Sequence, residues 1–265
     1  MKAKAIITLL SLLLVQFFQA QIDDKFYQPS KNLKPMDLKF EDISIPVEKD
    51  TITAIFLKPK VEKPKATILF FHGAGGNVSS YVFMVKPLVE NGFQVAMVDF
   101  RGYGKSTGIP THVNVAADGQ KFFDLITKRN DVKNTKIIVY GASLGSQISA
   151  HLARANKDKI SGLVIDGGMS SFADIAAVFA PQFKDALAKM LSSVYAAKED
   201  VKFTEGLPKL FIYSKNDKTV PYSQGEEVYK NASEPKQFLE FTADHLSAVT
   251  EKPAEVVKAV KDLIK

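Results

Sequence analysis

The chain has 265 residues, 46% of them hydrophobic, which is enough to bury the core of one α/β domain. It contains no cysteine, and this excludes disulfide bonds, a thiol nucleophile and thiolate metal sites. The formal net charge is +6 at pH 7, but lysines alternate with acidic residues along the sequence, a pattern typical of a solvated surface and not of a nucleic-acid partner.

The N-terminus predicts a Sec-type signal peptide over residues 1–20. Lys2 and Lys4 come before an almost wholly apolar run. We expect cleavage after Ala20, so that residues 21–265 are exported to the periplasm or the extracellular space with no stable membrane insertion. Because Phe18 is large for a position three residues before the cut, a retained membrane anchor is the alternative.

Apolar runs alternate with amphipathic segments along the rest of the chain. Residues 38–47 and 51–59 predict an N-terminal antiparallel hairpin. Six further apolar runs predict buried parallel strands, at residues 66–71, 94–100, 136–140, 161–165, 210–214 and 237–241. Helices are expected at residues 79–91, 113–130, 144–156, 222–230 and 254–264. This order predicts a mainly parallel, eight-stranded sheet flanked by helices on both faces.

Two glycine-rich loops follow the first two parallel strands. The first reads His72-Gly-Ala-Gly-Gly-Asn77, without the Gly-Lys-Ser/Thr ending of a phosphate-binding loop or the spacing of a dinucleotide-binding loop. A flexible turn that happens to contain a histidine is one interpretation of it. The second covers residues 99–108, where we expect Asp99 and Arg101 to make buried hydrogen bonds in a structural turn.

The next strand ends in Gly141-Ala-Ser-Leu-Gly145, a Gly-x-Ser-x-Gly pattern that leads into a helix. So sharp a turn strains the serine backbone, and the two glycines supply the room that it needs. The turn would expose the hydroxyl of Ser143 and direct the N–H of Leu144 toward the same space, as nucleophile and oxyanion donor. Taken alone, such a turn can also serve only close packing.

A serine nucleophile needs a positioned base, and this chain offers four histidines. Only His245 lies C-terminal to the serine beyond its own helix, just after the last predicted strand. Asp217 follows the strand before it, so Ser143, Asp217 and His245 occur in the order Ser, Asp, His. We expect His112 and His151 on helix surfaces.

Two other carboxylates compete with Asp217 for the acid position. Asp166 lies at the end of the strand predicted at residues 161–165, one strand before that of Asp217. Asp244 directly precedes His245, but neighbouring side chains generally point apart, so it is disfavoured. Asp217 is the favoured group to fix the tautomer and stabilise the imidazolium.

Residues 170–207 contain more chain than one crossover helix requires. Their apolar positions recur at roughly helical spacing. Two interpretations are open: an amphipathic crossover packed on the sheet, or a short helical lid insertion over the serine that favours a hydrophobic acyl or aromatic group.

These motifs resemble the α/β-hydrolase fold family over nearly all of residues 21–265, and most of all its serine aminopeptidase-like and monoacylglycerol-lipase-like branches. The matching segments are the loop 72–77, the loop 99–108, the serine turn, Asn216-Asp217 with Val220-Pro221, and Asp244-His245. The resemblance implies that Ala74 gives the second oxyanion N–H beside Leu144, that His72 organises its loop, and that the lid lies within 170–207. It implies no cofactor and no metal.

We therefore expect a serine hydrolase that acts on a small or medium acyl substrate by two-step acyl transfer through Ser143, His245 and Asp217. Carboxylesterase or lipase-like activity is favoured over peptide hydrolysis. A serine aminopeptidase-like peptidase would need a carboxylate to hold the substrate's amino group, and the sequence does not locate one. A catalytically silent binding protein on the same fold is the alternative of another class. The sequence does not indicate an oligomeric state.

Overall fold

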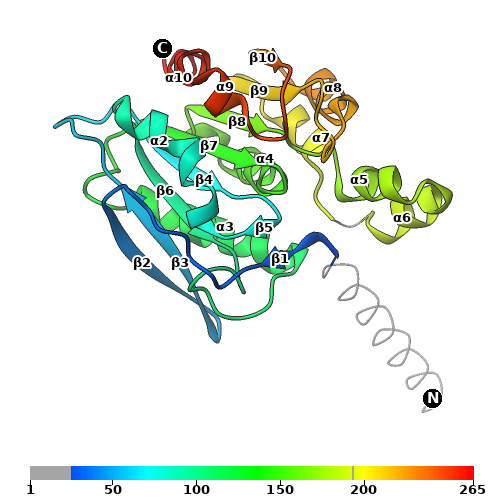
Figure 1. Cartoon of the computed structure of the whole chain (residues 1–265), viewed down its shortest axis with the longest axis horizontal. Coiled ribbons are helices and arrows are strands. Elements are labelled where there is room, and N and C mark those ends of the chain that lie inside the picture. Colours follow the sequence, from blue (N-terminus) through cyan, green and yellow to red (C-terminus); the bar gives the residue numbers. More distant parts are fainter. Residues whose placement is uncertain (1–24, 193) are drawn as a thin grey trace.

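We describe the protein from a computed structural model, and the description concerns residues 25–192 and 194–265. The predicted signal peptide, residues 1–20, lies outside the described residues. Strands and helices alternate along the described chain, and the strands form one eight-stranded sheet and a separate two-stranded pair (Figure 1). No helix within 25–192 or 194–265 combines the length and the apolar character needed to cross a membrane.

All eight predicted strands are confirmed, and their order across the sheet is β10-β9-β8-β7-β4-β6-β3-β2. They are β2 (Phe40–Val47), β3 (Asp50–Leu57), β4 (Thr67–Phe71), β6 (Gln94–Asp99), β7 (Ile137–Ala142), β8 (Gly162–Asp166), β9 (Lys209–Ser214) and β10 (Lys236–Phe241). β2 and β3 form the expected hairpin, and β3 pairs antiparallel with β6, whereas the other neighbours are parallel. In such sheets ligands bind beyond the carboxyl ends of the parallel strands.

Burial explains why the parallel strands are unbroken apolar runs. Every residue of β4, β6, β7, β8 and β9 is buried, because helices cover both faces. Successive side chains point to opposite faces, so Phe70 and Phe71 belong to different cores. The core of Phe71 lies under α3 (His112–Thr127), α4 (Gly145–Asn156) and α8 (Tyr222–Asn231), and that of Phe70 under α2 (Val82–Glu90), α9 (Ala248–Glu251) and α10 (Pro253–Asp262).

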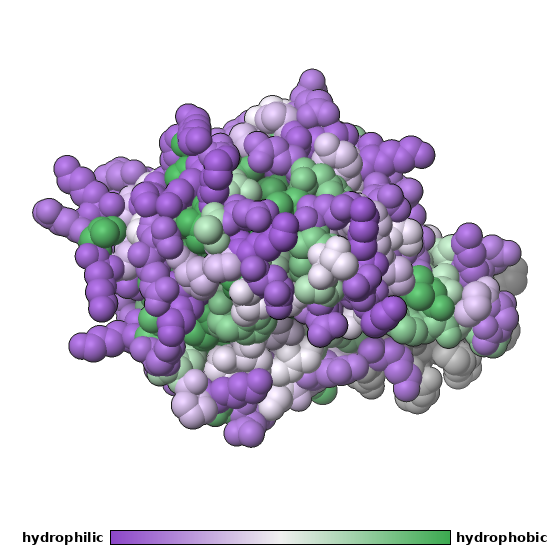
Figure 2. Space-filling view, turned by 45° about the horizontal axis from the view of Figure 1, so that its top comes forward, coloured by the Kyte–Doolittle hydropathy of each residue, from purple (hydrophilic) through white to green (hydrophobic). Residues whose placement is uncertain are grey.

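Residues 170–207 do not form a single crossover helix. They contain α5 (Phe172–Phe179), α6 (Lys184–Met190) and α7 (Ala197–Asp200). α7 packs against α4 and α8, whereas no residue of α6 is buried. Residues 172–190, which we call the arm, stand out from the body of the molecule (Figure 1) and present apolar surface at the right of Figure 2. The exposed large apolar side chains of the arm are Val178, Phe179, Phe183 and Met190.

Candidate active site

The chain turns sharply from β7, which ends at Ala142, into α4, which begins at Gly145. Ser143 lies in this turn with a φ of 52°, in the left-handed region that residues other than glycine rarely adopt. Its N–H donates to the carbonyl of Asp166 at the end of β8 (2.8 Å). A Cβ on Gly145 would lie 2.1 Å from the carbonyl oxygen of Phe71, so the turn leaves no room for a side chain there.

His245 and Asp217 meet across the loops that follow β10 and β9. Nδ1 of His245 lies 2.5 Å from Oδ2 of Asp217. The other carboxylate oxygen, Oδ1, accepts the backbone N–H groups of Thr219 and Val220, each at 2.8 Å. These amides fix the carboxylate so that Oδ2 faces the imidazole. When Nδ1–H donates to Asp217, Nε2 of the neutral ring keeps the lone pair that a general base needs.

A pair of glycines after β8 brings the imidazole next to the serine turn. A Cβ on Gly167 would lie 2.9 Å from Cε1 of His245, so the ring lies directly against this glycine. Gly167 follows the residue whose carbonyl binds the N–H of Ser143. The hydroxyl of Tyr213 donates to the carbonyl of Gly168 (2.8 Å) and holds this backbone in position. Ser143 and His245 therefore lie around one turn at the carboxyl end of β8.

Of the carboxylates that competed in the sequence, Asp217 is the one hydrogen-bonded to His245 among the described residues. Asp166 is buried, and its Oδ2 accepts the hydroxyl of Tyr140 (2.6 Å). Burial raises the pKa of Asp166 to about 7. Asp244 is exposed.

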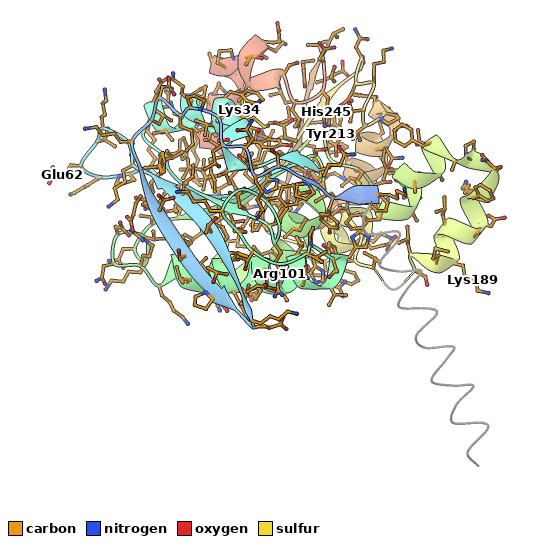
Figure 3. The ribbon with its side chains drawn as sticks, turned by 60° about the horizontal axis from the view of Figure 1, so that its bottom comes forward. Lys34, Glu62, Arg101, Lys189, Tyr213 and His245 are labelled. Carbon is orange, nitrogen blue, oxygen red and sulfur yellow. The ribbon has the colours of Figure 1, made fainter. Side chains whose placement is uncertain are left out.

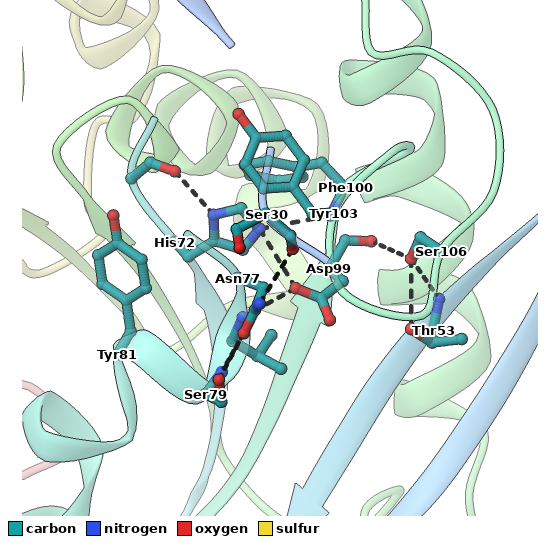
Figure 4. Close-up of polar contacts among 12 residues, drawn as sticks. Ser30, Thr53, His72, Asn77, Ser79, Tyr81, Asp99, Phe100, Tyr103 and Ser106 are labelled. Carbon is teal, nitrogen blue, oxygen red and sulfur yellow. Dashed lines mark hydrogen bonds and ion pairs between the residues drawn. The ribbon is translucent and has the colours of Figure 1, made fainter. Parts of the chain in front are cut away.

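A buried histidine fixes the first glycine-rich loop. Nδ1 of His72 donates to the carbonyl of Gly73 (2.7 Å), and Nε2 faces the N–H of Phe100 (3.4 Å; Figure 4). Complete burial lowers the pKa of His72 to about 4, so the ring is neutral at pH 7. Since a trans peptide directs its C=O and N–H to opposite sides, this bond turns the N–H of Ala74 away from His72.

Ser143, Ala74 and Leu144 all line one cavity of about 520 Å³. Its other walls come from residues 25–28, from α5 and from the loop that holds Asp217, and Lys25 is the single charged residue among the described lining. Sequence analysis missed residues 25–28 because they precede the first predicted strand and carry no motif. A second, open cavity of about 600 Å³ lies between α2 and α10 and contains none of the predicted site residues.

The second glycine-rich loop is structural, as the sequence predicts. Oδ1 of Asp99 accepts the N–H of Val78 (2.8 Å). Arg101 donates to both carboxylate oxygens of the buried Asp118 (2.7 and 2.9 Å), and it lies well apart from His245 in Figure 3. No group of three or more His, Asp or Glu side chains within the described chain could hold a metal ion.

The expectation that His112 lies on a helix surface is wrong. It is buried at the start of α3, where its ring packs 3.9 Å from that of Phe172 and its Nδ1 lies 3.1 Å from the hydroxyl of Tyr27. Both partners are distant in sequence, so helical periodicity could not reveal this burial. His151 is half-exposed on α4 and lies 3.0 Å from the carboxylate of Asp200.

Comparison with known proteins identifies relatives along most of the chain. The family model described as serine aminopeptidase, S33, matches residues 62–202. The protein YfhR of Escherichia coli (strain K12), described as uncharacterized, is 29% identical over 195 residues, which cover 73% of this chain and 67% of YfhR. The protein bem46 of Schizosaccharomyces pombe is 25% identical over 194 residues, which cover 72% of this chain and 65% of bem46.

Solved structures with the same fold include two esterases. The Pyrococcus furiosus esterase Pf2001 has a TM-score of 0.72 at 17% identity and covers 90% of this chain and 97% of its own. Acetyl xylan esterase 1 from a Thermoanaerobacterium species has a TM-score of 0.69 at 17% identity, covering 95% of this chain and 94% of its own. At these identities the likeness establishes the architecture and leaves the substrate open.

Proposed function

Because this chain belongs to the serine aminopeptidase S33 family of the α/β-hydrolases, we propose that it is a serine hydrolase that cleaves an ester, thioester or amide by two-step acyl transfer. Ser143 attacks the carbonyl carbon, and Nε2 of His245 takes the hydroxyl proton and passes it to the leaving group. Asp217 orients the imidazole and stabilises its charged form. Water then attacks the acyl-enzyme while His245 takes a proton from the water, and the proton returns to Ser143 as the acyl group leaves.

The observation that carries this proposal is the 2.5 Å contact between His245 and Asp217, beside a serine held at a φ of 52°. Strain of this kind costs about 1–3 kcal/mol and persists where the surrounding structure imposes it, which is common at active sites. The N–H groups of Ala74 and Leu144 are the oxyanion donors in this proposal. Removing one such donor costs a catalyst roughly 3 kcal/mol of transition-state stabilisation.

The lining of the cavity favours an ester with an apolar acyl group over a peptide. An aminopeptidase must hold the charged amino group of its substrate, for which a carboxylate near the nucleophile is the natural partner. None of the described residues that line the cavity is acidic, and the single charged one, Lys25, is basic. The two proteins of known structure named above are esterases, which agrees with this preference.

A burst assay of purified protein on p-nitrophenyl esters from acetyl to dodecanoyl, beside its Ser143→Ala variant, tests the proposal. We expect turnover and fluorophosphonate labelling that both disappear in the variant, while its thermal unfolding stays close to that of the wild type. Labelling that persists in Ser143→Ala would contradict the assignment of the nucleophile. Absence of turnover and labelling in the wild type would favour a binding protein, and labelling without ester turnover would favour a peptidase.

We also propose that the protein is exported, on the signal-peptide pattern of residues 1–20. Mass spectrometry of the N-terminus, after fractionation of cells that express the full chain, tests this. We expect an N-terminus at Gln21 in the exported fraction. An intact N-terminus in the membrane fraction would support the anchor, and an intact one in the cytoplasm would contradict export.

A further inference from the structure

Residues 25–30, which we call the N-terminal strap, run along the loop that carries Ala74 (Figure 1). Within the strap, β1 (Gln28–Pro29) pairs in parallel with β5 (Gly75–Gly76). The N–H of Gln28 donates to the carbonyl of Ala74, and that of Ser30 to the carbonyl of Gly76, both at 2.9 Å. The strap is therefore bonded through its backbone to the proposed oxyanion loop.

Two side chains tighten this connection. The hydroxyl of Tyr103 lies 2.9 Å from the N–H of Gln28 and donates to the carbonyl of Ala74 at 2.5 Å. The side-chain amide of Asn77 donates to the carbonyl of Ser30 (3.0 Å; Figure 4). Tyr103 and Asn77 are both buried, so these hydrogen bonds fix the position of the strap relative to the loop.

The side chains of the strap reach the base of the arm. The ring of Phe26 packs edge-on against that of Phe172, the first residue of α5, with centroids 5.1 Å apart, and lies 5.3 Å from the ring of His112. The neighbouring Tyr27 is buried, and its hydroxyl is paired with His112 at 3.1 Å. These contacts fix the direction in which Phe26 points.

Phe26 lines the same cavity as Ser143, with Ile175 and Phe179 of α5 as further walls. We propose that the strap is a wall of the acyl-binding cavity and that Phe26 is a specificity-determining residue, which limits the length of the acyl chain that reaches Ser143. This inference rests on the proposed hydrolase function and adds a residue that no catalytic motif indicates.

Hydrolysis by Phe26 variants of the full chain tests this directly. Phe26→Ala should enlarge the cavity and Phe26→Trp should shorten it. We expect the ratio of kcat/KM for dodecanoyl over hexanoyl esters to rise about tenfold or more in the first and to fall in the second, since an apolar pocket discriminates one methylene by roughly 10- to 200-fold. Phe83→Ala, which removes an exposed ring from α2, is the matched control and should leave the ratio unchanged.

A binding measurement separates failure of this inference from failure of the proposed function. Calorimetric titration of decanol into Ser143→Ala, with and without Phe26→Trp, requires no catalysis. We expect at least a tenfold loss of decanol affinity with Phe26→Trp, whether or not the wild type hydrolyses esters. Equal affinities, or an unchanged ester profile in an active enzyme, would overturn the inference. Phe26→Leu, which keeps an apolar side chain of intermediate size, replaces Phe26→Ala if the latter does not fold, and should shift the profile in the same direction.

Discussion

Asp217 uses one carboxylate oxygen for two backbone amides and the other for His245. Ser143 and Ala74 are likewise positioned by backbone groups, the first through the carbonyl of Asp166 and the second through the N–H of Gln28, which donates to its carbonyl. Backbone groups have no rotamers to lose, so they fix a site with little additional loss of side-chain entropy. At the scale of single residues, the site is thus preorganised by main-chain hydrogen bonds.

Substitution of Asp217 tests this preorganisation. Asp217→Asn keeps the shape of the side chain but offers His245 an amide, which favours the wrong tautomer of the imidazole. We expect kcat to fall roughly 10⁴-fold with an unchanged fold, as measured by ester turnover and circular dichroism. Asp244→Asn is the matched control, because Asp244 is exposed and adjacent to the same histidine. A comparable loss of activity in Asp244→Asn would contradict the assignment of the acid.

The buried Asp166 should make stability depend on pH. Its pKa is raised from 3.8 to about 7, chiefly by burial, so between these values the native state binds a proton that the unfolded chain lacks. The free energy of unfolding that Asp166 contributes therefore falls as pH rises through this window. Asp166→Asn cannot ionise, so we expect the variant to gain up to roughly 4 kcal/mol relative to the wild type between pH 4 and 8.

Urea unfolding of both proteins at several pH values measures this difference. His72, whose pKa is lowered, gives a pH dependence of the opposite sign, but it is present in both proteins and cancels in the comparison. A difference that does not change with pH would contradict the raised pKa of Asp166.

Among the secondary-structure elements, α5 is the part of the arm that reaches the site. Ile175 and Phe179 of α5 line the cavity, while Val178 is partly and Phe179 largely exposed to solvent. A helix that lines a cavity with some side chains and exposes others to solvent buries little area against the rest of the protein. It can therefore open and close over the cavity at low cost in free energy. We propose on this basis that the arm is the lid expected from the sequence.

Shortening of single side chains on the arm tests whether it acts as a lid. Phe179→Ala removes a cavity-lining ring, and we expect the preferred acyl chain to change, with a loss of about 1–3 kcal/mol in transition-state binding of the longer esters. Met190→Ala is the control, because Met190 lies on the same arm but outside the cavity lining. Ester profiles over the same chain-length series measure both variants. An unchanged profile in Phe179→Ala would contradict a lid that contacts the acyl group.

At the scale of the whole molecule, Arg101 connects distant parts of the fold. It donates to Asp118 on α3 and to Glu48 and Asp50 at the hairpin turn (2.9 and 3.2 Å). Arg101 and Asp118 are both buried, so each compensates the charge of the other. This network ties the antiparallel edge of the sheet to the helix layer.

Arg101→Ala should leave Asp118 buried and unpaired. We expect the free energy of unfolding to fall by about 3–5 kcal/mol, measured by urea denaturation, with part of the loss recovered in Arg101→Ala/Asp118→Ala. Lys105→Ala is the control, because it removes a pair with Asp42 that is exposed and therefore contributes about 1 kcal/mol or less. The folded fraction of Arg101→Ala should keep its activity, and an equal cost for both single variants would contradict the buried network.

Much of this architecture could be predicted because its signals are local. The apolar runs gave all eight strands, and Gly141 and Gly145 predicted the turn because the space that it needs excludes a Cβ at each position. The five predicted helices are present with boundaries shifted by a few residues, whereas α9 was missed because four residues show no periodicity. The burial of His112 was missed because its partners, Tyr27 and Phe172, come from segments far away in the chain.

The sequence alone determined the fold class, the strand order along the chain and the candidate residues Ser143, Asp217 and His245, because each depends on residue type and short-range spacing. Only the tertiary structure showed which of the competing carboxylates is hydrogen-bonded to His245, since that depends on which loop brings an oxygen to 2.5 Å from the ring. The position of Phe26 at the cavity likewise came only from the tertiary structure, because most of the other residues that line the cavity lie far from Phe26 in the sequence. Contacts between segments far apart in sequence depend on packing of the whole chain and leave no periodic or local signal in it.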